Sequence, residues 1–391
     1  MKKREIPVNK LHEEIIKIKN YKSMDEVIDA ASSLFPFDID GALTRDLYQK
    51  SRKEFENELS LDITVKLARW FTPRLFGWIE NQGSMKTFRD LLKMLGTAYS
   101  QITKPWSSLF TSYVFTALSI SKEYGAKEAW IISRDASPLF LIAIGIRDKI
   151  KWDGGIRLVE CNRDLFGIPA VFDPKGKETK RTATSFGKSP EEVRKLPIYS
   201  YLKKIRGATS KKITWIETGY HGTLIKKIAD LDLLGDVLVF FLSSSNPNIL
   251  GYANILVIYE NLKKRQIPDD FIYILGDQIE SLPKFYKNVQ ILKYKKGIKL
   301  VAEPVNPIYK FCSMVSYWTL FNESLNIDPK QVDSLMEVRK LYKLYLKVVS
   351  NPNELPFVLP ECIPGWKDGI TFLKNEFNLG PLLPMRDWWG P

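Results

Sequence analysis

The hydrophobic pattern divides the chain into a helical part, a part with short apolar runs, and a helical end. Up to about residue 120, apolar residues recur three and four positions apart, the spacing of one buried helix face. This spacing is clearest at 11–21, 25–35, 87–102 and 109–125. Helical spacing returns from about residue 325, and the last residues, GPLLPMRDWWGP, predict an irregular closing segment.

Between these parts, apolar runs alternate with helical or loop segments. The runs are AWII, GIRLVEC, ITWIE, DVLVFFLSS, ILVIYE and DFIYILGD. Each is nearly continuous, which is typical of strands buried on both faces. We therefore expect an α/β fold with a mostly parallel, doubly wound, Rossmann-like sheet. The expected division is a helical lead-in or cap at 1–120, an α/β core at 121–300, and a helical and irregular C-terminal extension at 301–391.

Composition narrows the class of protein. The 391 residues, 45% of them apolar, are enough for a substantial core. The three cysteines are widely spaced and form no CxxC pair, which argues against a cysteine-rich zinc site and favours a cytoplasmic location. The charged N-terminal stretch lacks the apolar core of a secretory signal, and no run reaches about 18 apolar residues. We expect a soluble protein with no membrane partner.

Charge points to anionic partners. The excess of 58 Lys and Arg over 45 Asp and Glu gives a formal charge of +13, which suits nucleotides, phosphorylated sugars or nucleic acid. The alternative is an ion-pair-rich surface of the thermophile type. Residues 165–212 hold twelve Lys or Arg and four acids. This stretch is either a lid over an anionic substrate, a nucleic-acid contact, or a solvated surface insertion.

The residues that follow the third apolar run predict a phosphate site. They are Glu217, Thr218, Gly219, His221, Gly222 and Thr223. Glycines allow backbone amides to approach a ligand, threonines offer hydroxyls, and the helix expected next attracts anions at its N-terminus. Glu217 would bind ribose hydroxyls or a phosphate-bound Mg²⁺ through water. His221 would donate to phosphate or act as acid or base, unless it only fixes a tight turn with Thr223 at the cap.

Two further runs end in polar residues. Ser133, Arg134, Asp135 and Ser137 follow AWII, and Arg163 follows the next run. Ligands of parallel α/β sheets bind outside the carboxyl ends of the strands, so these side chains are candidates for a second phosphate. The alternative is a pair of internal ion pairs, Arg134 with Asp164 and Asp135 with Arg163.

This order of pieces resembles that of type I phosphoribosyltransferases. The matching pieces are WIISRDASPLF, the basic stretch 165–212 and ITWIETGYHGTL, over roughly residues 126–245. The resemblance implies a Mg²⁺-dependent transferase with Glu217, His221 and Asp135 as catalytic candidates. Thr218, Gly219, Gly222 and Thr223 would hold the 5-phosphate and ribose, and Ser133, Arg134, Ser137 and Arg163 the rest of the substrate. The family usually shows two adjacent acids where this chain has Glu217 alone.

The motifs SRDA, CNRD and ExGxxGT are also similar to those in the C-terminal halves of haloacid-dehalogenase-like proteins of polysaccharide clusters. In FPFDIDGALTRD, that resemblance implies Asp38 as nucleophile and Asp40 as acid around magnesium, with Asp277 as a later metal ligand. The alternative is a chance match in a helix-to-loop segment, with Asp38 or Asp40 capping the next helix.

Three functions follow from these patterns. The leading hypothesis is a Mg²⁺-dependent, phosphoribosyltransferase-like enzyme acting on a phosphorylated sugar or nucleotide. A dehalogenase-like phosphatase using Asp38 and Asp40 is the second. The third is a non-enzymatic basic protein that binds nucleic acid or assembles with other chains. Each of the three functions is compatible with a homo-oligomer.

Overall fold

The structure is a computed structural model, and it describes ten segments of the chain. These are residues 5–62, 65–133, 136–166, 189–207, 212–220, 223–233, 237–244, 254–257, 282–294 and 297–332. Among the candidates named above, Arg134, Asp135, His221, Gly222 and Asp277 lie outside the described residues. So do the strand expected at DFIYILGD and nearly all of the helix expected from residue 325 on.

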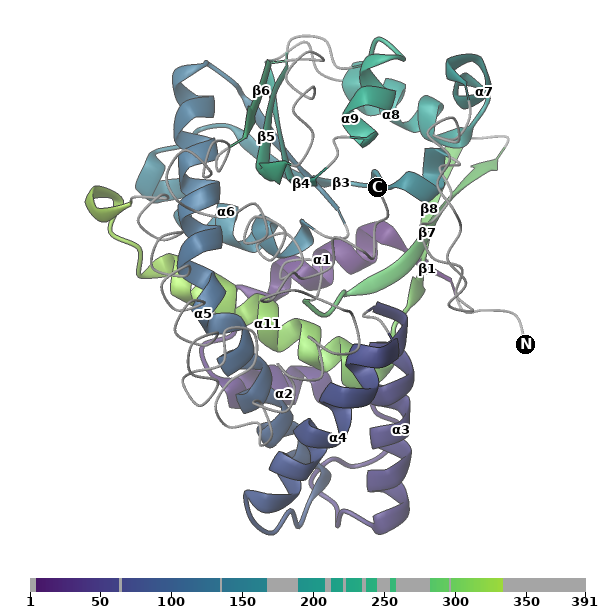
Figure 1. The fold of residues 1–391 in the computed structure, drawn as a ribbon, viewed down its shortest axis with the longest axis vertical. Helices are drawn as coiled ribbons and strands as arrows, with labels where there is room; N and C mark the ends of the chain where they lie inside the picture. The colour runs from purple at the N-terminus through teal and green to yellow at the C-terminus, as the bar shows by residue number, and fades with distance from the viewer. Residues whose placement is uncertain are drawn as a thin grey trace.

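Helices make up most of the described chain (Figure 1). They are α1 (Val8–Ile18), α2 (Met24–Ser32), α3 (Arg45–Asp62), α4 (Val65–Asn81), α5 (Phe88–Glu123), α6 (Ser137–Ile150), α7 (Pro190–Arg194), α8 (Pro197–Gly207), α9 (Thr223–Ala229) and α11 (Pro307–Leu325), with short 3₁₀ turns η1 (Arg163–Phe166) and η4 (Pro329–Gln331). The strands are β1 (Ile6–Pro7), β2 (Glu128–Ile132), β3 (Gly155–Val159), β4 (Ile213–Tyr220), β5 (Val237–Ser244), β6 (Asn254–Val257), β7 (Tyr286–Tyr294) and β8 (Gly297–Pro304).

A five-stranded sheet forms the α/β part. Its order is β3-β2-β4-β5-β6, and every neighbouring pair is parallel. The expected α/β class and parallel sheet are therefore confirmed. From β2 the chain first adds β3 on one side, then returns to the other side with β4. The direction of winding thus reverses between β2 and β4.

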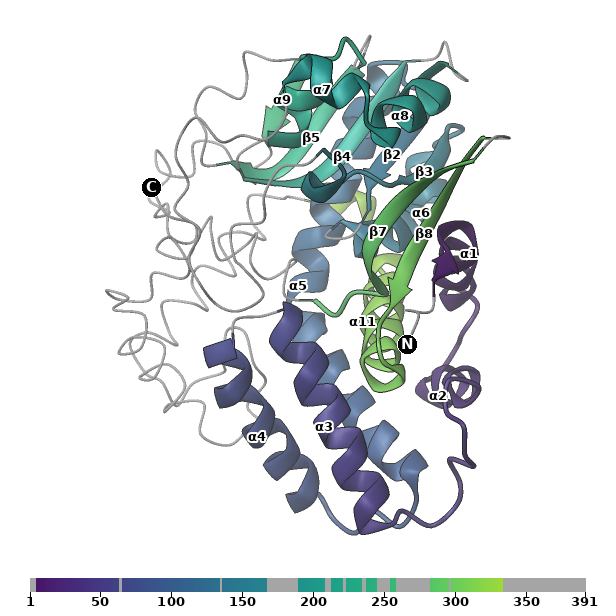
Figure 2. The same cartoon turned by 90° about the vertical axis from the view of Figure 1, so that its right-hand side faces the viewer.

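Helices cover both faces of this sheet, because successive side chains of a strand point to opposite faces. In β2, Ala129 and Ile131 join the core formed with α5 and α6. Trp130 and Ile132 join a second cluster with Ile198 of α8 and other residues of α8 and α9. Figure 2 shows α8 and α9 on one side of the strands and α5 and α6 on the other. This double burial explains why β2 and the first part of β5 are almost continuously apolar.

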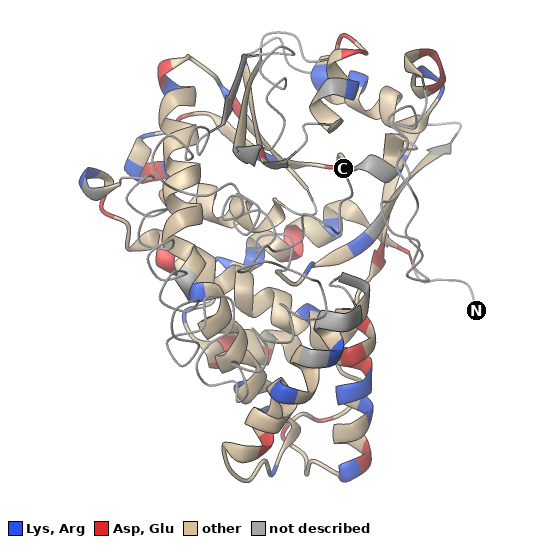
Figure 3. Ribbon diagram, in the orientation of Figure 1, with Lys and Arg blue, Asp and Glu red and all other residues tan. Residues whose placement is uncertain are grey.

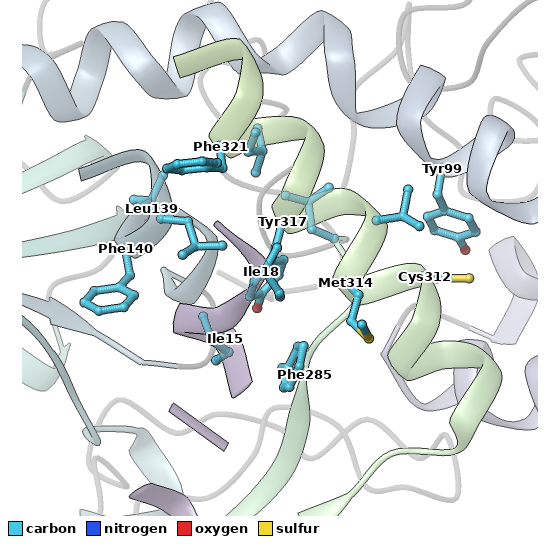
Figure 4. Packing of buried hydrophobic residues seen from close by; sticks show 14 of the residues in the cluster. Ile15, Ile18, Tyr99, Leu139, Phe140, Phe285, Cys312, Met314, Tyr317 and Phe321 are labelled. Carbon is cyan, nitrogen blue, oxygen red and sulfur yellow. The ribbon is translucent and has the colours of Figure 1, made fainter. Parts of the chain in front are cut away.

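The main core lies where α1, α5, α6 and α11 meet (Figure 4). Tyr317 and Phe321 of α11 pack with Ile18 of α1 and Leu139 of α6. Most of α11 is buried, so it lacks the one-sided pattern by which the other helices were predicted. The C-terminal extension expected from residue 301 thus begins with part of β8 and a central core helix. Among the described residues, no helix is long and apolar enough to cross a membrane.

A three-stranded antiparallel sheet, β1-β8-β7, was not predicted. β1 has only two residues, and β7 departs from regular pairing between Lys287 and Gln290. Lys287 of β7 also forms an ion pair with Glu58 of α3, with both carboxylate oxygens 3.0 Å from Nζ. Short strands and an irregular register weaken the sequence signal. The sheet nevertheless joins the start of the chain to residues near 300.

Helix α5 runs without a break through two stretches that the sequence predicts separately. It begins with a capping box, in which Thr87 Oγ1 accepts from the Asp90 N–H at 3.1 Å and Asp90 accepts from the Thr87 N–H at 2.8 Å. The Thr87 hydrogen bonds are the main cause of a lowered pKa for Asp90. In the neighbouring α3, Lys50, Arg52 and Lys53 precede Glu54, Glu56 and Glu58, so the basic and acidic residues are grouped along the helix (Figure 3).

Replacement of Thr87 by alanine removes the side-chain acceptor at the start of α5. We expect a loss of about 1 kcal/mol in the free energy of unfolding, the usual effect of losing an N-cap. Urea denaturation of the full chain measures it. The matched control is Thr97→Ala on the exposed face of the same helix, which should leave stability nearly unchanged; equal losses in both variants would contradict a specific role for the cap.

Candidate functional site

The carboxyl ends of three neighbouring strands bring Ser133, Glu160 and Glu217 together. The pairing of Ile132 with Val159 places Ser133 beside Glu160, one step past the ends of β2 and β3. The Ser133 N–H donates to the Val159 carbonyl at 2.9 Å. The pairing of Ile131 with Ile216 places Glu217 beside Ile132 on the other side of β2. The prediction that the ends of these strands lie at one edge is confirmed.

Glu160 is the centre of a polar cluster inside this edge. The residue is fully buried, and its carboxylate accepts hydrogen bonds from three side chains. The Tyr286 hydroxyl lies 2.6 Å from Oε1, His12 Nε2 lies 2.8 Å from the same oxygen, and the Ser133 hydroxyl donates to Oε2. These donors come from β7, α1 and the end of β2. A buried carboxyl group needs hydrogen-bonding partners of this kind, because it has lost its contacts with water.

Two tyrosines next to Glu160 remain protonated. Burial, and after it the charge of Glu160, raises the pKa of Tyr286 well above its ordinary value. Burial and then Glu160 also raise the pKa of Tyr201. The Tyr201 oxygen accepts from the Glu160 N–H at 3.3 Å. Tyr286 is therefore a hydrogen-bond donor to Glu160 at neutral pH, whereas Tyr201 supports the backbone beside it.

Cys161 follows Glu160 and faces the α8 and α9 side of the sheet. Burial is the largest cause that raises the pKa of its thiol, followed by the charges of Glu217 and Glu160. Because the thiolate is the reactive form, this cysteine is not an activated nucleophile. The influence of both carboxylates on one thiol also indicates that they form one electrostatic environment at the edge of the sheet.

Glu217 lies within β4 and not after it. The strand continues to Tyr220, and Gly219 pairs with Ser243 of β5. The expectation that the loop begins at Glu217 is therefore wrong for residues 217–220. The Tyr113 hydroxyl of α5 donates to the Glu217 carbonyl at 2.7 Å and lies 3.1 Å from the Phe240 carbonyl, which joins β4 to β5 near this edge. Thr223 is the first residue of α9, as the predicted helix requires.

Three predicted substrate hydroxyls are nearly inaccessible. Ser133, Ser137 and Thr218 are only 4%, 1% and 3% exposed. In addition, the single hydroxyl proton of Ser133 is used in the bond to Glu160, so it cannot donate to a phosphate at the same time. These residues support the site from below its surface. Arg163 belongs to η1, directly after β3.

Asp38 and Asp40 lie far from this arrangement in the fold, in the turn between α2 and α3. Asp38 Oδ1 accepts from the Asp40 N–H at 3.0 Å, and Asp40 lies 3.7 Å from Arg89. Neither acid follows a strand of the parallel sheet. The cap of α3 is Thr44, whose hydroxyl accepts from the Leu47 N–H at 3.2 Å, so the alternative that an acid caps this helix is wrong.

The basic stretch 165–212 is partly a packed layer of the fold. Its described residues 189–207 form α7 and α8, and Val193, Ile198 and Leu202 are buried against the sheet. Lys203 and Lys204 are exposed on the other side of α8. Residues 167–188 and 208–211, which hold the rest of the expected lid, lie outside the described residues.

Sequence reasoning missed His12, Glu160 and Tyr286. His12 lies on an amphipathic helix far along the chain from the strands, so only the fold brings it to Glu160. Tyr286 belongs to the unpredicted β7. Glu160 had a usable signal, since a single acid ends the apolar run GIRLVEC, and a charged residue at a buried strand end needs partners.

No family model and no curated protein matches the sequence. Within the described part of the chain, no group of three or more His, Cys, Asp or Glu side chains is arranged to hold a metal ion. The case for a function therefore rests on the geometry of the carboxyl edge.

Replacement of Tyr286 by phenylalanine removes one of the three donors to a buried carboxylate. We expect the free energy of unfolding to fall by about 2 kcal/mol, within the range for hydrogen bonds to charged groups. Denaturant unfolding measures this loss. Tyr199→Phe on α8 is the control, because that partly exposed ring contacts Lys203 and its change should cost less than about 0.5 kcal/mol. A neutral Tyr286→Phe variant would refute the donor role.

Proposed function

We propose that this protein is an enzyme that binds a phosphorylated sugar or nucleotide at the carboxyl edge of its parallel sheet, between β2 and β4, and transfers a phosphoribosyl-type group. One observation carries the proposal: Ser133, Glu160 and Glu217 lie at nearly the same level along three neighbouring strands, at the place where the strand order reverses. In open α/β sheets, ligands bind in the crevice outside the strand ends at such a reversal. We also infer that the sheet is of the doubly wound, Rossmann-like class, because helices cover both faces.

The proposed roles follow from position. Glu217 lies within β4, level with the last residue of β2, and its carboxylate would interact with ribose hydroxyls or with a phosphate-bound Mg²⁺. A single carboxylate together with substrate phosphates is a common environment for Mg²⁺, which neutralises phosphate charge when bound. Helix α6 begins at Ser137, two residues after Asp135 in the sequence, and the positive N-terminal end of its dipole favours a second phosphate at this point.

The chemistry of such a transfer needs little covalent help from the protein. Departure of diphosphate leaves an oxocarbenium-like centre on the sugar, so the enzyme must mainly orient the reactants and exclude water. The buried floor of the site suits this task, since Ser133, Glu160 and Thr218 are shielded from solvent. No specific observation favours the phosphatase or the nucleic-acid alternative, and Asp38 and Asp40 occupy a turn outside the sheet.

Calorimetric titration of phosphoribosyl diphosphate with Mg²⁺ tests the proposal. We expect micromolar binding to the wild-type chain and loss of binding in Glu217→Gln, which removes the charge and keeps the shape of the side chain. Ribose 5-phosphate and inorganic phosphate, titrated separately, identify which part of the ligand is recognised.

Asp230→Asn is the matched control, because this exposed acid follows α9 in the same strand-helix unit and lies outside the proposed site. It should bind like the wild type. Absence of binding to the wild type would refute the proposal. Equal weakening in Glu217→Gln and Asp230→Asn would instead indicate a general effect of charge.

A further inference from the structure

We propose that His12 is the acid–base residue of the carboxyl-edge site and that Glu160 holds its imidazole in one tautomer. This inference rests on the proposed function for the identity of the reaction. The cluster consists of His12, Glu160, Ser133 and Tyr286, all of which belong to the described residues.

The fold fixes the position of His12 from both sides. Ile6 and Pro7 of β1 pair with Ala302 and Val301 of β8 immediately before α1 begins. Within α1, Leu11 and Ile15 are buried in the main core. Leu11 immediately precedes His12, and Ile15 follows it by three residues. The imidazole is thus held by packing of its own helix and does not depend on a loop.

Hydrogen bonding selects the reactive nitrogen. Ser133 and Tyr286 each give their hydroxyl proton to Glu160, so the carboxylate is an acceptor in all its contacts with side chains. Facing that acceptor, His12 Nε2 must carry a proton. In the neutral imidazole the lone pair is then on Nδ1, which has no hydrogen-bond partner among the described residues. A carboxylate that orients a histidine in this way is a recurrent feature of general bases.

Exposure distinguishes His12 from the rest of the cluster. Its side chain is 22% exposed, whereas the Glu160 side chain is 1% exposed. Ser133 and Tyr286 are also buried, at 4% and 2%. Only His12 can therefore exchange a proton with a ligand or with solvent, and the buried members act as its support.

The position of the cluster fits a ligand that crosses the strand ends. Glu160 and Glu217 are on strands separated by β2, which corresponds to two strand spacings or about 10 Å. They face opposite sides of the sheet, yet both add to the effect of burial in raising the pKa of the Cys161 thiol. A small phosphorylated sugar lying over β2 spans this distance, with its phosphates toward Glu217 and its acceptor toward His12.

The proposed step exchanges one bond at sugar C1 for another. As the bond from sugar C1 to the diphosphate oxygen breaks, diphosphate leaves with the electron pair. The acceptor, which is water in the simplest assay, forms the new bond to C1 and gives its proton to His12 Nδ1. The resulting imidazolium is stabilised by Glu160 and returns the proton to solvent after the products leave.

Two measurements test this assignment. Nitrogen-15 NMR of the two histidine rings, assigned with His12→Gln, reports the tautomer without any ligand; we expect Nε2–H for neutral His12 and a changed tautomer population in Glu160→Gln. The second measurement is Mg²⁺-dependent release of diphosphate from phosphoribosyl diphosphate. Because glutamine keeps an N–H for Glu160 but has no basic lone pair, His12→Gln should lower kcat about 10²- to 10⁴-fold at unchanged affinity.

The outcomes separate this proposal from the previous one. Glu13→Gln, an exposed change on the same helix, should behave like the wild type in both measurements. An Nδ1–H tautomer in the wild type would overturn the role of His12, and so would full turnover by His12→Gln with normal binding. Either result leaves the transferase proposal standing. If calorimetry detects no binding of phosphoribosyl diphosphate to the wild type, the transferase proposal fails and this one fails with it.

Discussion

Hydrogen bonds to one buried carboxylate connect the parts of this molecule. Glu160 lies at the end of β3, and its three side-chain donors come from α1, from the end of β2, and from β7. These elements belong to the start of the chain, the parallel sheet and the antiparallel sheet. An ionised carboxylate without partners is very costly in a protein interior, because nothing replaces its lost contacts with water. The packing of the two sheets against α1 is therefore also an electrostatic requirement.

The helical core makes this arrangement rigid. Tyr317 and Phe321 of α11 lie among residues from α1 and α6, so the helix that carries His12 and the helix that follows β2 share one packed interior. Close-packed interiors have few alternative arrangements. Consequently His12 and Ser133, which are far apart in sequence, meet at Glu160 with defined geometry. A polar site assembled in this way differs from one formed by neighbouring residues of a single loop.

The sequence predicts the individual strands and helices well, and their tertiary arrangement poorly. The parallel strands were found because double burial makes them apolar throughout, and α1 and α2 because each buries one face. The helix α11 and the strand β7 were missed, since the first is buried on most sides and the second is irregular. At the site, Ser133 and Glu217 were found from their place after or within apolar runs. His12 and Tyr286 reach Glu160 only through tertiary packing, which leaves no spacing in the sequence.

The extent of β4 determines which side of the sheet Glu217 and its neighbours face. Because β4 stays paired with β5 as far as Tyr220, successive residues alternate between the two faces of the sheet. Glu217 faces the side of Cys161, whereas Thr218 points to the opposite side and is buried. An acid at position 218 would place a carboxylate in that covered layer, away from its neighbour. A regular strand can present only one of two adjacent side chains to the side of Cys161, and in β4 that side chain is Glu217, whereas the buried carboxylate of Glu160 on β3 faces the other side.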